Sequence, residues 1–196
     1  MTSPDVVAAL GPFLTVLQRM GVTYYLGGSL ASSAYGLPRS SLDADIIADL
    51  RAEHVPQLVE SLQADYYLSP SAMHAAIAEK SCFNAIHLET MFKIDVFAVK
   101  RRRYDRIELG RIRKGMLDAE DPRTEFLFPS PEDIVLNKLE WFRLGDEVSE
   151  RQWNDVLGVL KVQAGALDSE YLDQWATELG VSDLLEKARK AALGGG

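Results

Sequence analysis

A chain of 196 residues is long enough for one substantial hydrophobic core or two small domains. Hydrophobic residues make up 47% and charged residues 26%, as in ordinary soluble proteins, and the net charge of −8 argues against a general nucleic-acid coating protein. No apolar run approaches the roughly 18 residues of a membrane span, and the N-terminus lacks the features of a secretory signal. Cys82 is the single cysteine, which excludes an internal disulfide. We therefore expect a cytoplasmic protein without a membrane partner.

The first part of the chain mixes helix and strand signals. Apolar residues spaced by three and four predict amphipathic helices over 4–20, with Ser3 as N-cap, and over 53–64. Shorter helices are predicted over 29–35 and 71–80. Strands are predicted over 23–26, 43–48, 66–68, 82–88 and 92–99, with an extended segment over 124–128; residues 89–91 make the fourth and fifth strands a hairpin.

From Ser130 onward the chain shows only helix signals. N-cap residues precede four apolar-periodic stretches that end near residues 144, 163, 179 and 193, and these caps are Ser130, Ser149, Asp168 and Ser182. The sequence therefore predicts an α+β domain over 1–129, a C-terminal helical bundle over 130–193, and a frayed tail over 194–196.

Two adjacent stretches carry the strongest chemical signal. Gly27, Gly28 and Ser29 follow a short apolar strand and open a helix, where a backbone can approach a phosphate closely. Asp43 and Asp45 begin the next strand and, being two residues apart, point to the same face. Two close carboxylates need a cation between them, and Mg²⁺ is commonly held by carboxylates together with substrate phosphates. The alternative is an ordinary strand-turn-helix unit with acids at a strand entry.

The order of strand, Gly-Gly-Ser, short helix and Asp-x-Asp strand resembles the signature of the nucleotidyltransferase superfamily related to DNA polymerase β. The resemblance implies a mixed β-sheet flanked by helices, magnesium bound by Asp43 and Asp45, and nucleotide phosphates held by Gly27, Gly28 and Ser29. It also implies a third carboxylate on a later strand.

Asp95 is the candidate for that third carboxylate. It stands alone as an acid in the apolar segment Phe92–Val99, on the face opposite Ile94 and Val96. An ion pair with Lys93 or a nearby arginine is the structural alternative. With Asp43 and Asp45 it would hold two Mg²⁺ ions, and it is the natural general base for an attacking hydroxyl.

The helices beyond residue 130 add further candidates. The stretches around Lys138 and Asp155 resemble small bacterial nucleotidyltransferases of the AbiEii toxin type, and the resemblance implies that both residues face the nucleotide, Lys138 also as a catalytic residue. Solvated helical positions are the alternative for both. Arg39 is expected either to contact nucleotide phosphates or to pair with Asp43 or Asp45.

A basic run follows the strand that carries Asp95. Arg101, Arg102 and Arg103 are its centre, and they are candidates for binding a polyanionic acceptor such as RNA; a solvated charged face is the alternative. The three histidines, His54, His74 and His87, lack metal-ligand spacing and are expected to be structural or surface residues. Trp141, Trp153 and Trp175 are expected in the core.

The sequence thus supports a Mg²⁺-dependent nucleotidyltransferase that moves NMP from an NTP to a hydroxyl of tRNA or another RNA, a protein or a small molecule, and releases pyrophosphate. A role as a toxin with an antitoxin partner is part of the resemblance. The competing hypothesis is a catalytically degenerate nucleotide-binding or antitoxin/regulatory module.

Overall fold

The computed structural model describes residues 4–194, so that the predicted cap Ser3 and residues 195–196 of the predicted tail lie outside the described part. Gly194, which was also predicted in the tail, is the last residue of a helix. The helices of the first part are α1 (Pro4–Arg19), α2 (Gly28–Tyr35), the 3₁₀ turn η1 (Ala52–His54), α3 (Val55–Leu62), α4 (Pro70–Glu79), α5 (Arg103–Leu109) and η2 (Pro122–Thr124). The strands are β1 (Tyr24–Leu26), β2 (Asp43–Ala48), β3 (Tyr66–Tyr67), β4 (Cys82–His87), β5 (Lys93–Ala98), β6 (Arg113–Met116) and β7 (Glu125–Phe128). The later helices are α6 (Pro131–Leu144), α7 (Glu150–Val162), α8 (Ser169–Glu178) and α9 (Ser182–Gly194).

The chain divides into two compact units. The sheet unit contains the residues up to Gly27 and Ser40–Phe128, and the helical unit contains Gly28–Arg39 and the residues from Pro129 on. The sequence placed a domain boundary at residue 129; the contacts also assign α2 and the loop after it to the helical unit, although both flanking segments belong to the sheet unit.

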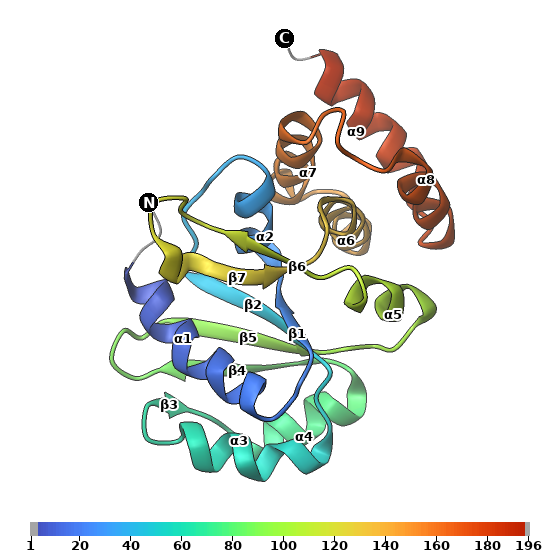
Figure 1. Ribbon diagram of the computed structural model, residues 1–196. Helices are drawn as coiled ribbons and strands as arrows, with labels where there is room; N and C mark the ends of the chain where they lie inside the picture. The colour runs from blue at the N-terminus through green and yellow to red at the C-terminus, as the bar shows by residue number, and fades with distance from the viewer. Residues whose placement is uncertain (1–3, 195–196) are drawn as a thin grey trace. The chain divides into compact units, whose positions relative to one another are not determined.

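The sheet unit is built on five strands in the order β1-β2-β5-β4-β3 (Figure 1). Strands β2 and β5 are parallel, and the other neighbours are antiparallel, so the sheet is mixed. The mixed α+β fold with its flanking helices and the following helical region is the one predicted from the sequence.

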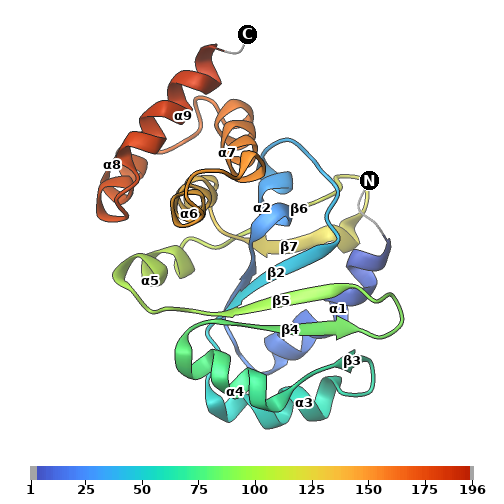
Figure 2. The same ribbon diagram turned by 180° about the vertical axis from the view of Figure 1, so that it is seen from behind.

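The two faces of the sheet differ because side chains alternate along each strand. Residues of β2 and β5 alternate strictly between buried and less buried positions, and the buried set includes Ile46, Ile94 and Val96. Helix α4 packs on β4 and β5, while the Tyr66 hydroxyl of β3 donates to the Ala9 carbonyl of α1 over 2.7 Å. Helices α3 and α4 lie along the lower edge in both ribbon views (Figures 1 and 2). The less buried face therefore carries the polar residues of β2 and β5.

The segment after β5, which showed no clear pattern, forms α5 and a hairpin. Strands β6 and β7 pair as a separate two-stranded antiparallel sheet, and β7 packs against β1. Helix α5 starts where the Asp105 carboxylate accepts the Arg102 backbone N–H over 2.7 Å.

Helices α6, α7 and α8 begin where the sequence predicted, whereas α9 includes Ser182, the predicted cap, as its first residue. The side chains of Ser130, Ser149 and Asp168 each accept a backbone N–H in the first turn of α6, α7 and α8. Helix α2 packs against α6 and α7, and α9 against α7 and α8. At the end of α2, a Cβ on Gly36 would lie 3.0 Å from the Val159 backbone nitrogen of α7, so this contact requires glycine.

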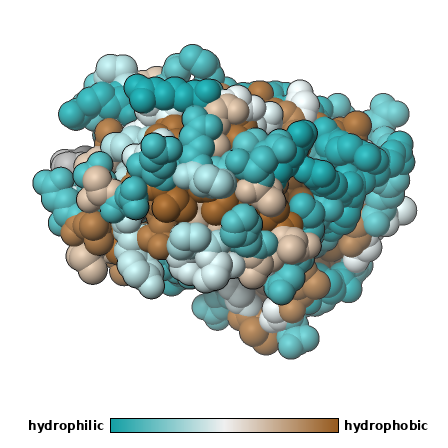
Figure 3. Space-filling model, turned by 90° about the horizontal axis from the view of Figure 1, so that it is seen from below, coloured by the Kyte–Doolittle hydropathy of each residue, from teal (hydrophilic) through white to brown (hydrophobic). Residues whose placement is uncertain are grey.

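One face of the molecule, seen in Figure 3, is largely hydrophilic, with apolar side chains showing between the polar ones. Within residues 4–194, no helix is both long enough and apolar enough to cross a membrane.

Candidate active site

The Gly-Gly-Ser turn stands at the junction of β1 and α2, as predicted. The Gly27 N–H donates to the Asp45 carbonyl over 2.8 Å, and a Cβ at Gly27 would lie 2.5 Å from the Ile47 Cδ1 atom. Gly27 therefore allows the chain to run against β2 where a larger residue would displace Ile47. Gly28 has a φ of +54° and begins α2, and the buried Ser29 follows it in the first turn.

The three predicted carboxylates lie on one face of the sheet. Asp45 of β2 is the direct partner of Asp95 of β5 in the parallel register, and Asp43 is the partner of Lys93. Because directly paired residues in adjacent strands point to the same face, all four side chains project from the less buried face. The sequence prediction that Asp43, Asp45 and Asp95 share a face on adjacent strands agrees with this register.

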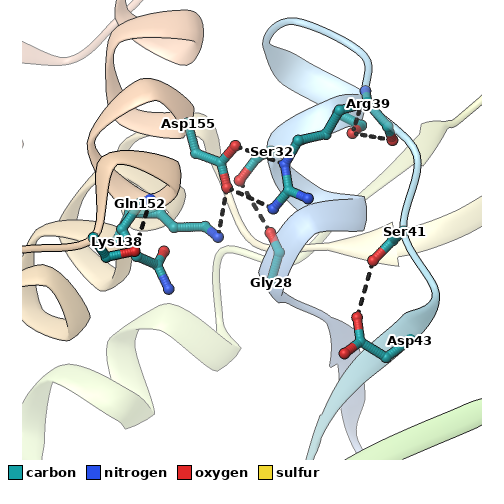
Figure 4. Close-up of polar contacts among 10 residues, drawn as sticks. Gly28, Ser32, Arg39, Ser41, Asp43, Lys138, Gln152 and Asp155 are labelled. Carbon is teal, nitrogen blue, oxygen red and sulfur yellow. Dashed lines mark hydrogen bonds and ion pairs between the residues drawn. The ribbon is translucent and has the colours of Figure 1, made fainter. Parts of the chain in front are cut away.

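Lys93 takes the position of a cation beside these acids. Its Nζ atom lies 2.7 Å from Asp95 Oδ2 and 3.9 Å from Asp43 Oδ2. The amide of Asn84, the β4 partner of Asp95, donates to the other Asp95 oxygen. The Ser41 hydroxyl donates to Asp43 Oδ1 over 2.9 Å, as Figure 4 shows. The ion pair with Lys93 that was the structural alternative for Asp95 is thus present, next to the other carboxylates.

The chemistry of this donor set suits Mg²⁺, which prefers carboxylate oxygens. In the described part of the chain, no three Asp, Glu, His or Cys side chains already converge on one metal position. The Lys93 ammonium instead supplies the positive charge between Asp43 and Asp95. The backbone register brings the carboxylates together, and their side chains and Lys93 would have to move for a metal to bind.

A second charged cluster lies in the helical unit. The Asp155 carboxylate of α7 accepts two hydrogen bonds from the Arg39 guanidinium, over 2.9 and 3.1 Å, and pairs with Lys138 Nζ of α6 over 2.8 Å (Figure 4). The side chains of Lys138 and Asp155 are only 7% and 6% exposed, whereas that of Arg39 is 28% exposed. The expectation that solvated helical positions could explain Lys138 and Asp155 is therefore wrong. Arg39 pairs with neither Asp43 nor Asp45 but with Asp155.

Burial alone would raise the pKa of Asp155, but hydrogen bonds from Arg39 and the charge of Lys138 outweigh it and hold that pKa below its usual range. Asp155 is consequently an anion with two cationic partners. The cluster carries a net positive charge, and the partly exposed guanidinium of Arg39 is its accessible end. Such a group can bind a phosphate while Asp155 keeps it oriented.

The basic run is more neutralised than the sequence indicated. Arg101, which has a φ of +65°, pairs with Asp49 over 2.9 Å. The Arg102 guanidinium pairs with Asp105 over 2.8 Å and belongs to the cap of α5, whose first residue is the exposed Arg103. Carboxylate partners therefore hold both Arg101 and Arg102 at the protein surface.

The expectations for the histidines and tryptophans are confirmed only in part. His87 is buried and hydrogen-bonded to Thr90, which fits a structural role, and Trp175 is in the core. Trp141 is 49% exposed, so its predicted core position is wrong. Sequence reasoning missed Asn84, which only the hairpin register brings to Asp95.

No protein-family model matches the sequence, and a search of the curated proteins finds no match. Solved structures do match. The chain is similar to ANT(2″)-Ia in complex with adenylyl-2″-tobramycin, with a TM-score of 0.56 and 10% identity over 90% of this chain and 97% of that one. It is also similar to an antigenic nucleotidyltransferase-like protein from Paracoccidioides brasiliensis, with a TM-score of 0.54 and 17% identity over 97% of this chain and 94% of that one. A third similar structure is the lincosamide antibiotic adenylyltransferase LnuA with lincomycin bound, with a TM-score of 0.51 and 15% identity over 82% of this chain and 98% of that one.

At these identities the likeness shows the fold. The chain has the fold of nucleotidyltransferases, in agreement with the mixed sheet and flanking helices predicted from the sequence.

Proposed function

We propose that this protein is a magnesium-dependent nucleotidyltransferase that transfers NMP from an NTP to a hydroxyl group and releases pyrophosphate. The observation that carries the proposal is the register pair Asp45 and Asp95, with Asp43 on the same face, in a chain with this fold. Three carboxylates on one face cost free energy through mutual repulsion, which a site for divalent cations would offset.

Each part of the carboxylate face has a role in this reaction. A bound Mg²⁺ would neutralise the triphosphate and the leaving pyrophosphate, and Asp43, Asp45 and Asp95 are the residues that would hold it. Asp95, whose side chain is 14% exposed, would accept the proton of the attacking hydroxyl. The oxygen–phosphorus bond then forms at the α-phosphate as the bond to the β-phosphate breaks, and the pyrophosphate leaves with those electrons.

The helical unit would contribute binding of the nucleotide. The backbone N–H groups at the start of α2, with Ser29, suit a phosphate. The Arg39 guanidinium, held by Asp155, and the buried Lys138 would provide a positive potential for nucleotide phosphates. Lys138 acts here through charge rather than by direct proton transfer, because its Nζ is fixed on Asp155.

A small molecule with a hydroxyl group is the acceptor that the observations favour. The chain is acidic overall, and Arg101 and Arg102 of the basic run already have carboxylate partners. Two of the similar structures are complexes with antibiotic compounds, ANT(2″)-Ia with adenylyl-2″-tobramycin and LnuA with lincomycin. An RNA or protein acceptor, and a toxin with an antitoxin partner, stay predictions from the sequence.

The test is an incubation of the protein with each α-labelled NTP, Mg²⁺ and an acceptor panel of aminoglycosides, a lincosamide, total RNA and cell lysate. We expect labelled product in a small-molecule arm and release of pyrophosphate in equal amount. Asp95→Asn should abolish both. The matched control is Asp49→Asn, which removes a carboxylate just beyond β2 that is paired with Arg101, and it should leave transfer intact.

The outcomes separate the competing functions. Label on RNA that is lost in the variant Arg101→Ala/Arg102→Ala/Arg103→Ala would identify RNA as the acceptor. Binding of NTP without any transfer would favour the catalytically degenerate module, and equal transfer by wild type and Asp95→Asn would contradict the proposed site.

A further inference from the structure

The position of Lys93 among the carboxylates calls for an explanation of its own. Its ammonium group contacts Asp95 Oδ2 over 2.7 Å and approaches Asp43 Oδ2 to 3.9 Å. A divalent cation bound by these acids would need the same oxygen atoms. The ammonium and the metal therefore compete for one location.

Charge balance explains why Lys93 stands there. Without a cation, three carboxylates on one face repel one another, and Lys93 supplies a positive charge from the strand position paired with Asp43. A lysine side chain is charged at neutral pH, so its ammonium group can balance the carboxylates that it contacts. Asn84 holds the other Asp95 oxygen, which leaves the Oδ2 atom for a cation.

We propose that Lys93 is a built-in counter-ion that occupies the cation position of the metal-free protein and is displaced when a divalent cation binds, so that it lowers the affinity of the site for metal. This inference rests on the metal-dependent function proposed above. It assigns to Lys93 a role in metal binding that the motif residues alone do not explain.

The Lys93 side chain can move away from the Asp95 carboxylate. Lys93 is the first residue of β5, and its side chain is 45% exposed, so water can receive the displaced ammonium. Lysine has a long flexible stem, and an ion pair of this exposure contributes little to stability.

The experiment compares binding of Mn²⁺, without nucleotide, to the wild type and to Lys93→Met by electron paramagnetic resonance at low ionic strength. We expect the variant to bind Mn²⁺ roughly two- to five-fold more tightly, the range that one exposed ion pair supports. Lys114→Met is the matched control, since it removes the same charge and one ion pair, with Glu125, on the separate two-stranded sheet. The control should bind Mn²⁺ as the wild type does.

Thermal melting gives a second readout that needs no enzymatic activity. Lys93→Met should melt below the wild type without metal and gain more from added Mn²⁺, whereas Lys93→Arg should resemble the wild type in both respects. Equal or weaker Mn²⁺ binding by Lys93→Met would overturn the role of Lys93 while leaving the metal site in place. Absence of Mn²⁺ binding in wild type and variant, with and without NTP, would overturn this inference and the proposed metal-dependent function together.

Discussion

Asp45 and Asp95 face each other across the parallel pair of β2 and β5, although they lie far apart in the sequence. Because the two backbones fix this pairing, a ligand that contacts one carboxylate meets the other. Replacing either residue should consequently disturb the same binding event.

The first prediction concerns Asp45→Asn and the effect of NTP with Mg²⁺ on thermal stability. A ligand that binds only the folded protein adds about 2.7 kcal/mol at 100 times its Kd. We expect the wild type to show a Mg²⁺-dependent rise in melting temperature with NTP, and Asp45→Asn to lose that dependence. Asp49→Asn should behave as the wild type, and an unchanged Mg²⁺-dependent shift in Asp45→Asn would place the metal elsewhere.

Asp155→Asn should strongly destabilise the helical unit. The substitution removes the negative charge that pairs with the buried Lys138, and breaking one side of a buried ion pair typically costs about 3–5 kcal/mol. Urea unfolding followed by circular dichroism measures the loss. Glu186→Gln is the control, because it removes a carboxylate of an exposed pair with Lys190 and should cause no measurable change.

The same variant has a predicted pH dependence. The folded-state pKa of Asp155 lies below the reference value of 3.8, so its ionised form stabilises the protein above that pH. As the pH falls through the folded-state pKa, the carboxylate is protonated and this stabilisation is lost. The difference in unfolding free energy between wild type and Asp155→Asn should therefore shrink below pH 3.8; a constant difference would argue that packing, and not charge, is responsible.

Gly36→Ala should destabilise the contact of α2 with α7. The added methyl would lie 2.8 Å from the Ser32 carbonyl oxygen and 3.0 Å from the Val159 nitrogen, both backbone atoms. Overpacking of this kind costs about 1–3 kcal/mol, measurable by urea unfolding. Gly11→Ala is the matched control: nothing lies within 4 Å of its added Cβ, and a helical alanine should stabilise slightly. Equal stability of the two variants would contradict the close contact.

Cys82 should react slowly with thiol reagents in the folded protein. Burial, together with the charges of Asp95 and Asp45, raises the pKa of its thiol from 9.0 to about 11. At pH 8 the thiolate fraction is then about 100-fold lower than in the unfolded chain, and alkylation should slow accordingly. Iodoacetamide labelling with and without urea measures the ratio, and comparable rates in both conditions would contradict the raised pKa.

Local patterns predicted much of the fold. An apolar run after two acids indicated a strand over 43–48, which is β2, and the serine and aspartate caps located α6, α7 and α8. The pairing register of the hairpin formed by β4 and β5 was harder to predict. A turn centred on Thr90 would pair Asn84 with Val96. The observed hairpin is shifted by one residue and pairs Asn84 with Asp95.

Contacts between distant residues were outside the reach of pattern reasoning. Arg39 and Asp155 lie on either side of the segment Ser40–Phe128 in the sequence, and no local signal distinguishes Asp155 from other acids of an amphipathic helix. Only packing of α2 on α7 explains why the pair forms, and the glycines at that contact were not singled out. Strand periodicity predicted that Asp43 and Asp45 share a face, whereas the place of Asp95 beside them was predicted from the family resemblance and agrees with the register of β2 and β5.

The segment Gly28–Arg39 belongs to the helical unit, and this has a consequence for how the protein folds during its synthesis. On the ribosome, α2 emerges early, but its partners α6 and α7 follow only after the whole sheet unit has been made. Forming such distant contacts requires closing a long loop, which slows folding. A fragment that stops at residue 128 would leave α2 without its packing partners, so we expect such truncations to aggregate rather than yield an independent catalytic core.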